Sequence, residues 1–218
     1  MRWTVMIGGR NSHDDALRVG WDSLKECGIG EFSLAGATVG TDASQLKLKV
    51  MDRVCRIDLS SERMSYEDGE REDVSAYLRI LTLHYLVGAR DKSPSGVMVS
   101  FREFEGGALY YSAFKKRTID VLTGTFGDDA DSLRRAGERL GATTLSSGSV
   151  SFRVKFFPKL PVDVLFWLGD EEVPSSANIL FDETAGKMIA TEDLSALAGA
   201  LCIRLIKSSS KAEPVGSK

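Results

Sequence analysis

Residues 156–206 read FFPKLPVDVLFWLGDEEVPSSANILFDETAGKMIATEDLSALAGALCIRLI, and this stretch predicts most of the C-terminal fold. Its first apolar run, residues 162–168, is rich in β-branched and aromatic residues and is bounded by proline and glycine, which is typical of a strand. A second run over residues 177–182 predicts another strand after a short acidic turn. Because neither face of the first run is polar, we expect a central strand that buries Trp167.

A helix is predicted over residues 191–207, where leucine and alanine recur every three or four positions. Thr191 precedes two acidic residues, and a threonine hydroxyl at this place is able to cap the free N–H groups of a helix. Upstream, residues 150–156 alternate apolar and polar side chains, which is typical of a strand. Three consecutive strands joined by short turns indicate an antiparallel meander, closed by the helix.

The N-terminal half contains further strands and helices in irregular order. Two strands at residues 46–50 and 54–59 form a predicted hairpin, followed by a polar connection over residues 60–73. The predicted helices and the remaining strand are: a helix capped by Ser12 and ending at Gly28, a nearly all-apolar helix over 74–87, a strand over 97–103, and helices over 110–123 and 131–140. Since strands and helices do not alternate regularly, we predict an α+β fold, mainly an antiparallel sheet (hairpin plus C-terminal meander) packed against several helices.

Length and composition are those of one globular domain, predicted over residues 1–207, with a polar and disordered C-terminal tail at 208–218. The 28 basic and 31 acidic residues give a formal net charge of −3, so the overall charge does not indicate binding to nucleic acid or to an anionic membrane. No apolar run approaches the ~20 residues that span a bilayer. The cysteines at positions 27, 55 and 202 lack paired spacing, which fits a reducing cytoplasm and disfavours a disulfide framework, a zinc site or a cluster held by this chain alone.

A candidate anion site surrounds two adjacent glycines between the strand at 97–103 and the helix at 110–123. Backbone N–H groups at a glycine turn and nearby cations are able to converge on an anionic ligand. The alternative is an ordinary turn, because neither a Walker sequence nor a G-x-G-x-x-G fingerprint is present. The candidate ligand-binding residues are Arg102, Gly106, Gly107, Tyr110, Tyr111 and Arg117.

His84 lies in the most apolar predicted helix and is a second candidate. It is a ligand for a tetrapyrrole metal or a general base in one interpretation, and a hydrogen-bonded core histidine in the other. The carboxylates at 170–172 and Asp182 would suit a hard cation if they met, but their spacing favours a solvated turn, and we predict no metal site. With two histidines and no G-x-S-x-G or H-E-x-x-H motif, hydrolase chemistry is disfavoured.

Several strings resemble an uncharacterised domain-of-unknown-function family of anaerobic bacteria and archaea, over about residues 14–206. They are VSFREF at 99–104, residues 107–111, FKKRTID at 114–120, FWLGDEE at 166–172, PSSANILFD at 174–182 and TEDL at 191–194. In that family the domain is found alone or behind a small cysteine-rich iron–sulfur domain similar to that of the corrinoid iron–sulfur protein. This chain lacks the cysteine-rich segment, so the resemblance implies that any cluster comes from a partner.

The resulting expectation is a cytoplasmic, non-catalytic binding module for a cofactor-bearing partner or a small ligand. By analogy with the resemblance, its setting would be anaerobic corrinoid or one-carbon metabolism, with an iron–sulfur or corrinoid protein as partner and no cofactor of its own. Two alternatives stay open. One is an enzyme acting on an anionic small molecule through Arg102, Tyr110 and Arg117, and the other is a tetrapyrrole-binding protein using His84.

Overall fold

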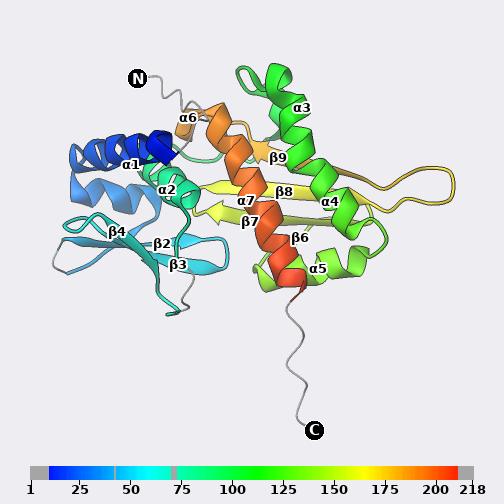
Figure 1. The fold of residues 1–218 in the computed structure, drawn as a ribbon, viewed down its shortest axis with the longest axis horizontal. Coiled ribbons are helices and arrows are strands. Elements are labelled where there is room, and N and C mark those ends of the chain that lie inside the picture. The colour runs from blue at the N-terminus through cyan, green and yellow to red at the C-terminus, as the bar shows by residue number, and fades with distance from the viewer. Residues whose placement is uncertain (1–9, 42, 70–72, 211–218) are drawn as a thin grey trace, which may run out of the picture.

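Two antiparallel sheets and seven α-helices make up the part of the chain that the computed structural model describes, residues 10–41, 43–69 and 73–210 (Figure 1). The predicted α+β class is confirmed. Within this part, no helix is long and apolar enough to cross a membrane.

The smaller sheet contains the predicted hairpin and two additional strands. Its order is β1 (Thr38–Val39), β2 (Gln45–Val50), β3 (Arg53–Asp58) and β4 (Arg63–Tyr66). Leu46, Leu48 and Val50 are buried while the residues between them are exposed, so the period-two pattern of β2 correctly indicated one wet face. The prediction of a bare connection over residues 60–73 was wrong, because β4 extends the hairpin by pairing with β3.

The larger sheet contains the predicted meander. Its order is β5 (Met98–Ser100), β9 (Ser176–Asp182), β8 (Leu160–Trp167), β7 (Val150–Phe157) and β6 (Thr143–Thr144). The central strand is β8, and its residues Val162, Val164 and Phe166 are fully buried. The position of the strand is therefore as expected from its continuous apolar run.

The predicted burial of Trp167 was wrong, because its ring is 39% exposed. On the face of β8 that it shares with Asp163 and Leu165, exposure rises along the strand, from the buried Asp163 to the half-buried Leu165 and the exposed Trp167. The apolar run of the sequence indicates that β8 is a central strand. It does not indicate that the elements packed on this face stop short of Trp167.

The helices flank both sheets. They are α1 (Arg10–Lys25), α2 (Ala76–Gly88), α3 (Gly107–Arg117), α4 (Ile119–Phe126), α5 (Ala130–Arg139), α6 (Ala185–Met188) and α7 (Thr191–Ser209), with 3-10 turns η1 (Ile29–Ala35) and η2 (Phe101–Glu103). Asp129 caps α5, since its carboxylate accepts the Ser132 N–H at 2.9 Å.

Several helix boundaries differ from those predicted. The helix expected over 110–123 is divided at the buried Thr118, which has non-helical backbone angles and donates its hydroxyl hydrogen to the Phe114 carbonyl at 2.7 Å. The predicted capping by Thr191 was wrong, since it is the first residue of α7 and Ala190 holds the cap position. α1 begins at Arg10, so Ser12 lies inside it and is not its cap.

Two further boundaries concern the strand before α3 and the C-terminus. β5 covers only part of the strand expected over 97–103, and η2 replaces the rest. α7 continues two residues past the expected end at 207, and Ser208 is buried. The remainder of the expected tail, residues 211–218, lies outside the described residues.

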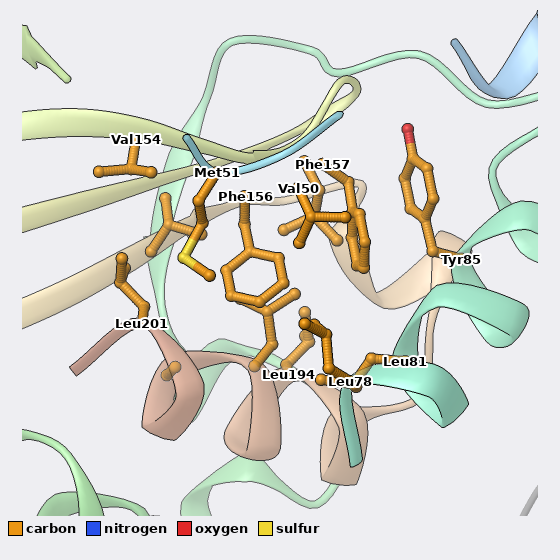
Figure 2. Close-up of a cluster of buried hydrophobic side chains, with 14 of the residues drawn as sticks. Val50, Met51, Leu78, Leu81, Tyr85, Val154, Phe156, Phe157, Leu194 and Leu201 are labelled. Atoms are coloured by element: carbon orange, nitrogen blue, oxygen red, sulfur yellow. The ribbon is translucent and has the colours of Figure 1, made fainter. Parts of the chain in front are cut away.

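The two sheets meet at the β2–β3 turn and β7. Met51 adopts a left-handed backbone conformation (φ 52°) in this turn, and its N–H donates to the Phe156 carbonyl at 2.9 Å. Figure 2 shows Phe156 and Phe157 beside this turn, facing Leu194 and Leu201 of α7 and the apolar side chains of α2. The buried apolar residues of both sheets form one continuous cluster, and α7 lies against it.

Asp182 at the end of β9 is a buried carboxylate whose hydrogen bonds hold the loop before β5. It accepts the backbone N–H groups of Ser95 (3.1 Å), Gly96 (2.7 Å) and Thr184 (3.0 Å) and both neighbouring hydroxyls. Burial raises the pKa of Asp182, but the hydrogen bonds led by those of Thr184 outweigh burial, and the net pKa is lowered.

Asp182→Asn should lower the free energy of unfolding by about 1–3 kcal/mol at neutral pH, because an amide accepts fewer of these bonds. A carboxylate with a lowered folded pKa stabilises the protein above its unfolded pKa of ~3.9 and loses this effect as the pH falls through the folded value. Denaturant unfolding between pH 7 and pH 3 should therefore show the difference from wild type shrinking in acid. The exposed Asp170→Asn is the matched control, and an equal loss in both variants would contradict the structural role of Asp182.

Candidate functional site

The structure separates the predicted anion-site residues into two groups. Arg102 lies in η2 with its guanidinium 3.8 Å from the centre of the Tyr111 ring, a cation–π contact. Tyr110, the next residue to Tyr111, faces a different surface, together with Arg117. Arg102 forms no ion pair within the described part of the chain, and the acidic Asp120 of α4 pairs with Lys115.

The two glycines of the candidate site are required by backbone geometry. Gly106 has a φ of 75°, in the left-handed region that favours glycine. A Cβ on Gly107 would lie 2.0 Å from the carbonyl oxygen of Phe101, because the first turn of α3 packs directly on η2. The ring stack of Phe101 on Phe114, with centroids 4.2 Å apart, depends on this close approach. The geometry supports the interpretation as a turn.

Gly107→Ala should destabilise the protein by about 1–3 kcal/mol, since a methyl group has no room beside the Phe101 carbonyl. Gly124→Ala in α4 is the matched control, because a Cβ there would meet no neighbour within 4 Å. That control should stabilise the helix by about 0.5–1 kcal/mol. Thermal unfolding measures both changes, and a neutral Gly107→Ala would refute the close approach of α3 and η2.

A groove of about 1090 Å³ runs along the outer face of α7 and contains Tyr110 and Arg117. One wall comes from α3 and α4, and the other comes from α2 and the β2–β3 turn. Figure 1 shows α7 between these two sets of elements. Most of the lining is apolar, and the groove therefore has the character of a ligand site.

The floor of the groove consists of small side chains on α7. Ala196, Gly199 and Ala200 line it, whereas the leucines at 194, 197, 201 and 205 point to the core and are fully buried. A Cβ on Gly199 would have no neighbour within 4 Å, so the space above it is open. Sequence reasoning missed this floor, although its signal was visible as a small-residue stripe opposite the leucine stripe.

Charged residues on the groove differ in how they are paired. Arg204 of α7 forms an ion pair with Asp52 of the β2–β3 turn, and Arg53 lies 3.4 Å from the centre of the Tyr66 ring. These contacts fix the wall next to the smaller sheet. Lys116 and Arg117 at the end of α3 are exposed, and within the described part of the chain neither has an acidic partner. They are available to an anionic group.

His84 joins α2 to α7 through Asp193. Its Nδ1 lies 2.7 Å from the Asp193 carboxylate, and the two side chains are only 8% and 10% exposed. Asp193 lines the groove, but His84 is not among the described lining residues. The contact ties together the two helices that form the floor and one wall.

The remaining candidates do not gather into a reactive cluster. Asp170 accepts the backbone N–H groups of Glu172 and Val173 within its own turn, and Asp182 is held by other partners. Burial raises the pKa of the Cys55 and Cys202 thiols to about 12, which keeps them protonated. In the described residues, no three His, Cys, Asp or Glu side chains are grouped to hold a metal ion.

Comparison with protein families gives one match, to a domain of unknown function (DUF3786) over residues 33–204. The chain belongs to the DUF3786 family. No curated protein and no solved structure matches it. The matched range of the DUF3786 domain includes the β2–β3 turn, α2, α3, α4 and all of α7 up to Arg204. Of the described residues that line the groove, all but His13 and Lys207 lie within the match, so this part of the groove belongs to the DUF3786 domain itself.

Proposed function

We propose that this DUF3786 domain is a non-catalytic binding module and that the groove along α7 is its binding site. The observation that carries the proposal is a large, mostly apolar groove with two cations on its wall, Lys116 and Arg117, that have no acidic partner among the described residues. Binding sites commonly combine an apolar surface with a few polar groups that fix orientation. The proposed occupant accordingly has an apolar surface and an anionic group.

Binding is favoured over catalysis because two of the carboxylates that line the groove are engaged by other side chains. Asp193 is engaged with His84, and Asp52 is engaged with Arg204. The alternative enzyme would use Arg102 together with Tyr110 and Arg117. Its support is weakened because Arg102 stacks on Tyr111 instead of lining the groove.

The proposed setting follows from the sequence resemblance. Related domains occur alone or behind an iron–sulfur domain, which suggests a cytoplasmic iron–sulfur or corrinoid protein of anaerobic metabolism as partner. The three cysteines of this chain are free and distant in sequence, so a cluster would reside on the partner. Native mass spectrometry of the protein purified anaerobically from its own host would report the mass of a bound ligand or partner.

Gly199→Trp should abolish ligand binding, because the indole would fill the open space above the groove floor. The probe is 8-anilinonaphthalene-1-sulfonate, an apolar anion whose fluorescence rises on burial. We expect the wild type to bind it and Gly199→Trp to bind about tenfold more weakly or not at all, a loss of at least about 1.4 kcal/mol.

Gly124→Trp is the matched control, since it adds the same ring to an open helical position outside the groove. Melting temperatures for all three proteins should confirm that each is folded. Equal probe binding by the three folded proteins would overturn the assignment of the groove as the binding site.

A further inference from the structure

We infer that the occupant of the groove is an amphipathic α-helix of a partner protein, lying antiparallel to α7. This inference rests on the proposed function and adds the class of ligand and its orientation. Recognition of this kind places the apolar stripe of one helix into an apolar groove of another protein.

The length of the groove suits a helix. Its lining includes α7 residues from Thr191 to Lys207, sixteen steps that correspond to about 24 Å at ~1.5 Å per residue. A helix of four to five turns has this length. The groove is also concave. If a second copy docked through the same face, a void would remain between the two α7 helices, so the occupant needs a convex surface.

The floor and walls match the surface of a helix. Ala196, Gly199 and Ala200 allow a helix backbone to approach α7 and leave room for large apolar side chains. Tyr77 on one wall and Tyr110 on the other are 48% and 51% exposed, and Ile203 of α7 is 57% exposed. Large apolar side chains exposed around one groove mark an interaction site.

Charge along the groove sets the orientation. Figure 1 shows α3 and α4 descending beside α7 in the direction in which α7 itself runs. Both α3 and α7 have basic residues in their last turns, and the exposed Glu192 lies in the first turn of α7. In an antiparallel partner helix, the first turns lie near the basic C-terminal ends of α3 and α7, and acidic residues are favoured in the first turns of a helix. The dipole of such a helix also runs opposite to the dipoles of α3 and α7. The predicted partner helix is therefore acidic at its start and basic at its end.

The test uses two synthetic fluorescent peptides of about 18 residues, the length of the groove. Both carry a leucine stripe at helical spacing. The first has glutamates in its first two turns and lysines in its last two, and the second has these charges exchanged. Fluorescence anisotropy at low salt should show the first peptide binding to the full chain about tenfold more tightly than the second.

Two kinds of variant locate the binding and its polarity. Gly199→Trp should remove binding of the first peptide, while the control Gly124→Trp should leave it unchanged. Changing Lys116→Glu together with Arg117→Glu should abolish or invert the preference between the peptides, because it reverses charge on the α3 wall.

The outcomes separate this inference from the proposed function. Equal binding of the two peptides would overturn the orientation, and binding insensitive to Gly199→Trp would overturn the site. A third outcome is that neither peptide binds, while the anilinonaphthalene probe binds the wild type and not Gly199→Trp. In that case the groove binds a small molecule, and the inference of a partner helix is refuted. If the probe is also insensitive to Gly199→Trp, the proposed function fails as well.

Discussion

The burial of one leucine stripe of α7 is the constraint on which the rest of the molecule depends. Leu194, Leu197, Leu201 and Leu205 are fully inaccessible, and Figure 2 shows Leu194 beside Phe156 and Leu201 on the side of Met51 and Val154. Each buried leucine contributes roughly 1.5–3 kcal/mol relative to an exposed one. This packing fixes the rotation of α7 about its axis. Since a helix repeats every 3.6 residues, the same rotation turns the alanine and glycine stripe outward and creates the floor of the groove.

The walls of the groove are held in place partly by residues that do not line it. Asp182 anchors the backbone at Ser95 and Gly96, which leads into β5, η2 and the start of α3. Gly107 then allows α3 to pack on η2. On the other wall, the Arg204–Asp52 ion pair joins α7 to the β2–β3 turn. A buried carboxylate and a glycine thus position side chains of the groove without lining it.

Adjacent residues on a helix point about 100° apart, which explains why the predicted anion site did not assemble as one unit. Tyr110, Ala113 and Arg117 recur at helical spacing and share the groove side of α3. Tyr111 belongs to the neighbouring face, where its ring receives the Arg102 guanidinium. The residues of the predicted anion site therefore lie on two surfaces of α3. One surface packs against Arg102, and the other faces the groove.

Local pattern in the sequence was sufficient for the α+β class, the β2–β3 hairpin, the meander of β7, β8 and β9, and the existence of α7, because each depends on a period along one segment. Tyr110 and Arg117, two of the predicted ligand-binding residues, line the groove. Only the tertiary structure decided that Trp167 is exposed, that Asp193 pairs with His84, and that the small stripe of α7 lies between α2 and α3. These features depend on which elements pack against one another, and contacts between segments distant in the chain leave no periodic signal within any one of them.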